Sequence, residues 1–265
     1  MTEYHGNILK MEAEPANPVR YSLPIGDKFV DMNELLGRPI QLVCNGQINC
    51  IACGKRTKTS YGQGFCYNCF RSVPEADASV VHPEMSRAEF GIARDLEWAK
   101  ANDLIPHYVY LAITGDVKVG VTREHQLPTR WLDQGAIQAI RLAKTPNRHI
   151  AGIIETFLKQ HYHDITNWHD MLQNVIAHVD LLAEKDKAVS LLPTELQQYR
   201  DDNQTVAVFN YPVQYLPQKP VSLTFDKTPE ISGTLTGIKG QYLLLDGNNA
   251  LSIRRHNGYF IQLIT

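Results

Sequence analysis

The sequence lacks any long apolar run. No stretch of the 265 residues approaches about 18 consecutive apolar side chains, which excludes an ordinary transmembrane helix. The opening segment, MTEYHGNILKMEAEP, has neither the basic region nor the apolar core that directs secretion. We therefore expect a cytoplasmic protein with no membrane partner, in a compartment where thiols stay reduced.

A strong excess of one charge is also missing. The net charge is −2 at pH 7, which excludes a chain coated all over for phosphate binding. The charge is nevertheless uneven, because residues 50–72 hold four basic residues and no acid, and residues 107–150 hold six basic residues against three acids. Both stretches could contact the phosphates of a nucleic acid, and a solvated surface is an equally favoured interpretation. Nothing in the sequence separates DNA from RNA.

Cysteine is scarce outside one segment. Four of the five cysteines form two Cys-x-x-Cys pairs, at Cys50, Cys53, Cys66 and Cys69. Reduced pairs of this kind favour a metal over disulfides, and two matched pairs favour zinc over a redox dithiol or an iron–sulfur cluster. Four thiolates would leave no open coordination position, so the ion would stabilise a zinc ribbon rather than catalyse a reaction. Cys44 lies outside this frame and is expected to be a buried thiol.

The remaining chain predicts an α+β fold. Alternating apolar residues indicate strands over 1–49 and six strands after Thr205, which we expect to form a small β-barrel together. Helical spacing indicates one helix beginning near Ser86 and helical structure over 171–199. The predicted parts are an N-terminal β segment (1–49), the zinc ribbon (50–72), a helical connector (73–106), a small mixed domain (107–170), a helical linker (171–200) and a C-terminal β-barrel (201–265).

The mixed domain has the clearest element order. YVYLAI and VKVGVT are rich in β-branched and aromatic residues and flank the turn TGD, which predicts a hairpin. LPTRWLDQGA predicts a helix with Pro128 in its first turn, IQAIRLA a third strand, and NRHIAGIIETFLKQHY a second helix with one apolar face. The predicted order is therefore β-β-α-β-α.

This order, with the residues on it, resembles the GIY-YIG nuclease superfamily over about a quarter of the chain. Y-V-Y at 108–110 and K-V-G at 118–120 resemble the two strand motifs of that superfamily, although Lys118 stands where a tyrosine is common. The resemblance implies a domain acting on DNA or RNA, with Glu155 holding a catalytic Mg²⁺ or Mn²⁺. The implied catalytic residues are Tyr110, Lys118, Arg130 and Glu155, and the expected substrate-binding residues are Tyr108, Arg123, Arg148 and Asn167.

Each implied role has a chemical basis. Phosphodiester cleavage needs a nucleophile, positive charge beside the phosphate and usually a divalent cation. Arg130 could neutralise the phosphate, and Glu155 could hold Mg²⁺ together with water molecules. Tyr110 could orient water or act as a general base, and the second role requires neighbouring cations to lower its pKa. Lys118 could contact phosphate, or it could mark a lineage that keeps binding without cleavage.

Other segments resemble a narrower group. QGFCYNCF, KVGVTR, TRWLDQGA and TNW are similar to an uncharacterised bacterial family defined only as a domain of unknown function. That resemblance implies no activity. Two functions therefore remain open, namely a metal-dependent nuclease of GIY-YIG type and a non-catalytic zinc-ribbon protein that binds nucleic acid or serves as a scaffold.

Overall fold

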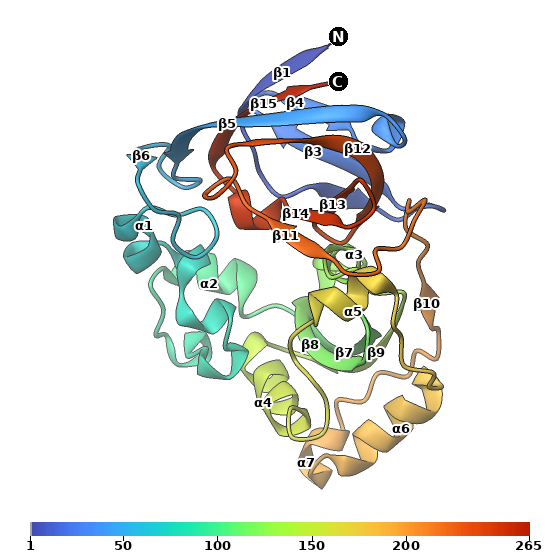
Figure 1. The fold of residues 1–265 in the computed structure, drawn as a ribbon. Coiled ribbons are helices and arrows are strands. Elements are labelled where there is room, and N and C mark those ends of the chain that lie inside the picture. The colour runs from blue at the N-terminus through green and yellow to red at the C-terminus, as the bar shows by residue number, and fades with distance from the viewer. Residues whose placement is uncertain (1) are drawn as a thin grey trace. The chain divides into compact units, whose positions relative to one another are not determined.

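The computed structural model describes residues 2–265, which divide into two compact units (Figure 1). Unit 1 combines the chain up to Arg71 with residues 209–265, and unit 2 spans residues 72–208. The N-terminal β segment, the ribbon and most of the C-terminal β segment therefore share one unit. The connector, the mixed domain and the helical linker share the other.

Unit 1 contains an eight-stranded sheet among the described residues. Seven strands follow the order β1-β15-β5-β12-β13-β14-β11, and β6 pairs with β5. Every apolar run predicted after Thr205 contains a strand, and the predicted tight turn at Asp246 and Gly247 joins β13 to β14. The strands are β1 (Glu3–Asn7), β5 (Pro39–Asn49), β6 (Arg56–Thr57), β11 (Val221–Leu223), β12 (Glu230–Lys239), β13 (Tyr242–Leu245), β14 (Asn249–Ser252) and β15 (Tyr259–Ile264).

The predicted closed β-barrel is wrong. The N- and C-terminal strands do pair, because β1 runs antiparallel to β15 and β5 lies between β15 and β12. However, the strand order of the described residues ends at β1 on one side and at β11 on the other, and these two do not pair. The N-terminal strands that could have bridged this gap form a separate three-stranded sheet of β2 (Glu12–Glu14), β3 (Arg20–Ile25) and β4 (Lys28–Asp31).

Unit 2 has a four-stranded sheet in the order β10-β9-β7-β8. Its mixed domain follows the predicted order β7-β8-α3-β9-α4, so that prediction is confirmed at the level of secondary structure. The strands are β7 (His107–Ile113), β8 (Val117–Arg123), β9 (Gln138–Thr145) and β10 (Ala207–Val208). The helices of unit 2 are α2 (Leu96–Asn102), α3 (Thr129–Asp133), α4 (Arg148–Leu158), α5 (Trp168–Gln173), α6 (Leu181–Leu191) and α7 (Thr194–Gln197).

The two faces of the β7–β8 hairpin differ in character. Side chains alternate across a strand, so Val109, Leu111 and Ile113 share one face and pack in an apolar cluster with residues of α4 and α6. The opposite face carries Tyr108 and Tyr110 from β7. The antiparallel register pairs Tyr110 with Gly120 and Ala112 with Lys118, which places Lys118 of β8 on this second face.

Two helix predictions need correction. No helix begins near Ser86, because the chain there forms short 3₁₀ turns, Gly91 adopts φ +73° and the Asp95 side chain caps α2 nine residues later. The predicted helical linker is broken where Asn174 adopts φ +56°. The 3₁₀ turns are η1 (Asn33–Leu35), η2 (Pro74–Ala76), η3 (Ala78–Val80), η4 (Pro83–Met85), η5 (Ala88–Phe90), η6 (Glu124–Gln126) and η7 (Arg254–His256).

The connector of unit 2 lies tightly against α4. A β-carbon added at Gly152 would stand 2.1 Å from the Glu84 nitrogen and 2.4 Å from the Pro83 carbonyl carbon, so only glycine permits this approach of η4. Arg148, in the first turn of α4, donates to the Ser79 and Val80 carbonyls at 2.7 and 2.8 Å. In the described part of the chain, the helices are too short or too polar to cross a bilayer.

Candidate metal centre and candidate active site

The four clustered cysteines meet at one point of unit 1. Cys50 follows β5, and the Gly54 N–H donates to the Cys50 carbonyl at 2.8 Å in a tight turn. Cys66 and Cys69 lie at the start of the short helix α1 (Tyr67–Ser72), where the Cys69 N–H points at the Cys66 sulfur from 3.5 Å. Backbone bonds between Tyr61 and Phe65 close the predicted short hairpin that separates the two pairs.

The spacing of the sulfurs suits a tetrahedral ion. All four lie within 4.8 Å of one another, and Cys53 Sγ is 3.9 Å from Cys66 Sγ. A tetrahedron with zinc–sulfur bonds of 2.3 Å requires sulfur–sulfur distances of about 3.8 Å. Partial burial raises the pKa of Cys50, but backbone N–H groups including those of Cys66 and Cys53 outweigh it and bring the pKa to about 6. The cluster could therefore hold a zinc ion with little rearrangement.

The polar face of the β7–β8 hairpin gathers the second set of predicted residues. Tyr110 is fully buried, and its hydroxyl donates to Gln134 Oε1 at 2.8 Å just after α3. The ring crosses Gly120 so closely that a β-carbon there would lie 2.5 Å from the hydroxyl oxygen. Arg130 of α3 lies near enough to this hydroxyl to affect its pKa, and the ring of Trp131 packs edge-on at 6.0 Å.

The charges of this face act on one another. The pKa of Lys118 is lowered to about 8, mainly by burial and secondly by the nearby Arg130, while Glu155 opposes both. Burial also raises the pKa of Tyr110, with Arg130 opposing and Glu155 adding to the rise. Four side chains from β7, β8, α3 and α4 thus lie close enough to interact electrostatically. The pKa of Tyr110 moves opposite to the direction that a general base needs.

Glu155 is the buried acid of this cluster. It is 7% exposed, and burial raises its pKa while Lys159 lowers it. Lys159 Nζ lies 3.5 Å from Glu155 Oε2 and 3.3 Å from Asp164 Oδ2. No hydrogen-bond donor reaches Oε2 among the described residues. Asp164 is also contacted by Lys118, whose ammonium donates to the Asp164 carbonyl at 2.8 Å.

The comparisons with known proteins give a family. Residues 37–261 match the family described as protein of unknown function (DUF2797). The chain belongs to this family. No curated protein and no solved structure matches the chain. Membership confirms the resemblance to an uncharacterised family, and the match spans both the cysteine cluster and the polar face of the hairpin.

The expected substrate-binding residues have hydrogen-bond partners other than Tyr110, Lys118, Arg130 and Glu155. Tyr108 shares the hairpin face with Tyr110, but its hydroxyl contacts Glu124 at 3.1 Å and its ring lies 4.8 Å from the Arg141 guanidinium carbon. Arg123 donates to the Asn102 carbonyl at 3.0 Å and stacks over Trp98.

The other two expected residues have local structural contacts. Arg148 is buried against the Ser79 and Val80 carbonyls, so its guanidinium joins α4 to the connector. Asn167 caps α5, accepting from the His169 N–H at 3.1 Å and donating to Asp170 Oδ2 at 2.6 Å.

Three residues that lie beside Tyr110, Lys118 and Glu155 were not predicted from the sequence. Lys159 could have been found, because it lies four residues after Glu155 on a helix and that spacing places the two side chains together. Gln134 and Asp164 gave no such signal. Gln134 follows the end of α3, and Asp164 comes from a segment without regular structure that pairs with β8 at Lys118 and His163.

Proposed function

We propose that unit 2 is a nuclease-like domain of GIY-YIG type that binds a phosphodiester of DNA or RNA and cleaves it with Mg²⁺ or Mn²⁺. The observation that carries this proposal is the buried Glu155 carboxylate of α4, which lies close enough to Arg130, Lys118 and Tyr110 for their charges to interact. These four residue types, in this chain order and on these elements, are what the resemblance implies. The family match itself names no activity.

The charge of the cluster suits an anionic substrate. Lys118, Arg130 and Lys159 bring three positive charges, and Glu155 and Asp164 bring two negative charges. An excess of positive charge in a partly buried site attracts a phosphodiester, and a guanidinium can contact two of its oxygens at once. Arg130 is half-buried, so it can reach both the buried face and a bound strand.

A divalent ion fits the acid of this cluster. Glu155 Oε2 is buried and accepts no hydrogen bond from the described residues, and its cation partner Lys159 stands 3.5 Å away, so a metal ion could take the place of this ammonium. Mg²⁺ commonly uses one or two carboxylates and keeps several waters. Glu155 would hold the ion, and Lys159 would turn toward Asp164, which it already contacts at 3.3 Å. When bound, the ion would lower the pKa of a coordinated water and neutralise charge on the phosphate.

The remaining residues would position the reacting groups. Burial raises the pKa of Tyr110 above its ordinary value, so its hydroxyl would position Gln134 by donating to it rather than act as a general base. Arg130 would bind the scissile phosphate. Lys118 would add positive charge beside it, and the Asp164 carbonyl would hold its ammonium in place.

One specific observation favours the alternative of binding without cleavage. Tyr110 has no exposed surface, and Lys159 already lies against Glu155, so two of the implied catalytic groups have partners within the protein. A domain that had lost cleavage would keep these contacts and retain the positive charge of Arg130 and Lys118. The zinc ribbon would then supply a second contact through its basic loop.

The test is cleavage and binding measured together. The purified full chain is incubated with labelled single- and double-stranded DNA and RNA in Mg²⁺, Mn²⁺ or EDTA, and binding is followed by fluorescence anisotropy. Glu155→Gln, which keeps the shape of the side chain, should lower the cleavage rate at least 100-fold because it removes the charge that holds the ion. The matched control is Glu195→Gln, a helix carboxylate on α7 with an exposed side chain.

Three results are informative. Metal-dependent cutting by the natural chain and by Glu195→Gln, lost in Glu155→Gln with binding intact, supports the nuclease. Binding without cutting in either metal, weakened at least tenfold by Arg130→Gln, replaces the nuclease with the binding function. Absence of both binding and cutting would refute the proposal for all four nucleic acids.

A further inference from the structure

The ribbon of unit 1 presents a group of aromatic rings to solvent. Tyr61, Tyr67 and Phe70 are 36%, 53% and 37% exposed. The ring of Tyr61 lies 5.5 Å from that of Tyr67, edge-on, and 6.0 Å from that of Phe70, stacked at an angle of 29°. The three rings therefore form one continuous exposed patch, which we name the ribbon aromatic surface. Contiguous exposed apolar groups indicate a binding site, whereas single ones are common on any protein.

The backbone of the ribbon holds these rings in place. Tyr61 and Phe65 exchange two backbone hydrogen bonds of 2.9 Å, and Gly62 between them adopts φ +52°. A β-carbon at Gly62 would lie 2.9 Å from the Phe70 ring, so this ring rests directly on the turn. Tyr67 and Phe70 are three residues apart on α1, and that spacing places both side chains on one face of the helix. Rings that are already held in position lose little conformational freedom when a ligand binds.

The same segment carries positive charge without compensation. Residues 50–72 contain Lys55, Arg56, Lys58 and Arg71 and no acid, and all four side chains are exposed. None of the four pairs with a carboxylate in the part of the chain that the structure describes. The Arg71 guanidinium lies 5.9 Å from the centre of the Tyr67 ring and donates to the Tyr67 hydroxyl at 3.2 Å, so one cation adjoins the rings directly. A ligand of this surface must therefore combine negative charge with flat groups that can stack.

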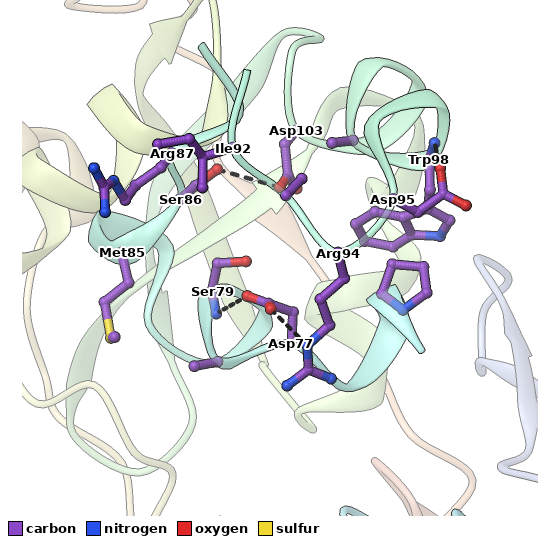
Figure 2. A pocket seen from close by; sticks show the side chains of 14 residues that line it. Asp77, Ser79, Met85, Ser86, Arg87, Ile92, Arg94, Asp95, Trp98 and Asp103 are labelled. Carbon is purple, nitrogen blue, oxygen red and sulfur yellow. Dashed lines mark hydrogen bonds and ion pairs between the residues drawn. The ribbon is translucent and has the colours of Figure 1, made fainter. Parts of the chain in front are cut away.

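These rings and cations are accessible, unlike the polar groups of the cavity in the connector of unit 2 (Figure 2). In that cavity the Ser86 hydroxyl donates to Asp103 at 3.2 Å, and Arg94 pairs with Asp77 at 2.9 Å. Because these side chains bond to one another, the cavity offers less to a ligand than its volume of about 410 Å³ suggests. The ribbon aromatic surface is the better candidate for a binding site.

We infer that the ribbon aromatic surface binds single-stranded nucleic acid, with bases stacked on its rings and phosphates held by the four cations. Every base has a flat π-face, and stacking on an aromatic side chain contributes about 1–3 kcal/mol per base. The phosphates supply the negative charge that the cations require. A duplex offers the phosphates alone, because its bases are stacked on one another.

Other ligands match this surface less well. An acidic peptide would meet the cations and leave the rings in water. A lipid surface needs a larger apolar area than three rings, two of which carry hydroxyl groups. In its class of ligand the inference rests on the proposed function, but the site is a different one: the rings lie in unit 1, whereas Arg130 and Glu155 lie in unit 2.

The test is fluorescence anisotropy of the full chain carrying Arg130→Gln, which weakens the proposed phosphate contact of unit 2 in every measurement. The labelled probes are single strands of thymidine and of uridine about 12 nucleotides long, a DNA duplex of that length, and an abasic DNA strand with the same phosphates. No Mg²⁺ or Mn²⁺ is added, so that no strand is cut. At least one of the two single strands should bind tenfold more tightly than the duplex and the abasic strand, because only a single strand offers bases to the rings.

Replacing one ring measures the stacking. Tyr67→Ala should weaken binding of the single strand by about 5- to 150-fold, the loss of one stacked base, and Tyr67→Phe should keep the affinity because it keeps the ring. The matched control is Tyr215→Ala, at a tyrosine of unit 1 that is 67% exposed and lies outside the ribbon, which should leave the affinity unchanged. The zinc content of each variant reports whether the ribbon is intact.

A second variant covers the case in which Tyr67→Ala disturbs the ribbon. Lys58 is exposed and its ammonium has no partner among the described residues, so Lys58→Gln removes a charge without breaking a contact. It should reduce the slope of log affinity against log salt concentration by about 0.7, the value for one phosphate contact on a single strand. Lys219→Gln makes the same charge change at an exposed position outside the ribbon and should leave the slope unchanged.

Several results would overturn the inference. Equal affinity for the single strands, the duplex and the abasic strand would show that charge alone attracts the ligand. Unchanged binding in both Tyr67→Ala and Lys58→Gln would remove the ribbon from the site. Displacement of the strand by polyglutamate, or by vesicles of phosphatidylserine and phosphatidylcholine, as effective as displacement by unlabelled strand would assign the surface to an acidic protein or a membrane.

The two proposals fail in different ways. If the nuclease proposal is wrong, Glu155→Gln changes no cleavage, while Tyr67→Ala still weakens binding of the single strand. If the ribbon inference is wrong, Tyr67→Ala binds as its parent does, while the effects of Glu155→Gln on cleavage and of Arg130→Gln on binding remain.

Discussion

Replacing Lys118 with methionine tests the electrostatics of the hairpin face. Lys118 is 4% exposed, and burial is the main cause that lowers its pKa from the ordinary 10.5 to about 8. That fall corresponds to about 3 kcal/mol of cost for keeping the ammonium charged in the folded state. Methionine removes this cost. It also removes the hydrogen bond to the Asp164 carbonyl, and the loss of that bond destabilises the folded state by about 1 kcal/mol. We expect Lys118→Met to stabilise unit 2 by about 2 kcal/mol at pH 7.

The pH dependence provides the sharper measurement. Below about pH 8 the Lys118 ammonium is charged in both the folded and the unfolded state, so the folded state bears the full cost of burying the charge. Between about pH 8 and 10.5 the unfolded chain binds more protons than the folded chain, so the natural protein gains stability as the pH rises. Between pH 7 and 9.5 this gain should be about 2 kcal/mol relative to Lys118→Met. The advantage of the variant should therefore disappear near pH 9.5.

Tryptophan fluorescence during urea unfolding reports on the correct unit. All three tryptophans, Trp98, Trp131 and Trp168, lie in unit 2. Lys100→Met, at an exposed position of α2, is the control and should follow the natural chain across this pH range. Parallel stability curves for Lys118→Met and the natural chain from pH 7 to 9.5 would refute a buried, pKa-shifted Lys118. The cluster could then not be the partly desolvated site that the proposed function requires.

Two further changes test packing and metal binding. Gly152→Ala usually stabilises a helix, but here its β-carbon would meet the backbone of Glu84 at 2.1 Å, so we expect a loss of about 2 kcal/mol in urea unfolding of unit 2. An unchanged or higher stability would show that η4 does not lie against α4. Purified protein should contain one zinc ion per chain by mass spectrometry of metals; Cys69→Ser should lose it, and Cys44→Ser should keep it because Cys44 lies outside the cluster. Equal zinc content in both variants would contradict four-thiolate binding.

Local patterns predicted the elements whose residues carry strong, short-range signals. The hairpin over 107–123 was predictable because β-branched residues alternate on both sides of a Gly-containing turn. The cysteine cluster was predictable because two Cys-x-x-Cys turns leave few other uses for four reduced thiols. The expected helix at Ser86 failed because helical spacing of a few apolar residues says nothing about Gly91, whose left-handed conformation ends the turn, or about Asp95, which caps the real helix.

The remaining features depend on contacts between distant residues. The sequence does not distinguish an open sheet from a barrel, because the residue pattern of each strand is the same whether or not the edge strands β1 and β11 pair. The burial of Arg148 could not be predicted for a similar reason. A cation in a basic stretch suggests a residue that binds phosphate, whereas the partners of Arg148 are backbone carbonyls about seventy residues earlier in the chain. The sequence suggested Tyr110, Lys118, Arg130 and Glu155 as candidates but gave no sign of their burial, which raises the pKa of Tyr110.

The pairing of β5 has a consequence for synthesis of the chain. This strand, Pro39–Asn49, has as its long neighbours β12 and β15, which are translated some two hundred residues later. Unit 2 contains all of its own strand partners and can be finished while the last segment is still inside the ribosome. During that interval β5 lacks both of its long partners, and a bound ion at the neighbouring cysteines would fix the end of this strand to the ribbon.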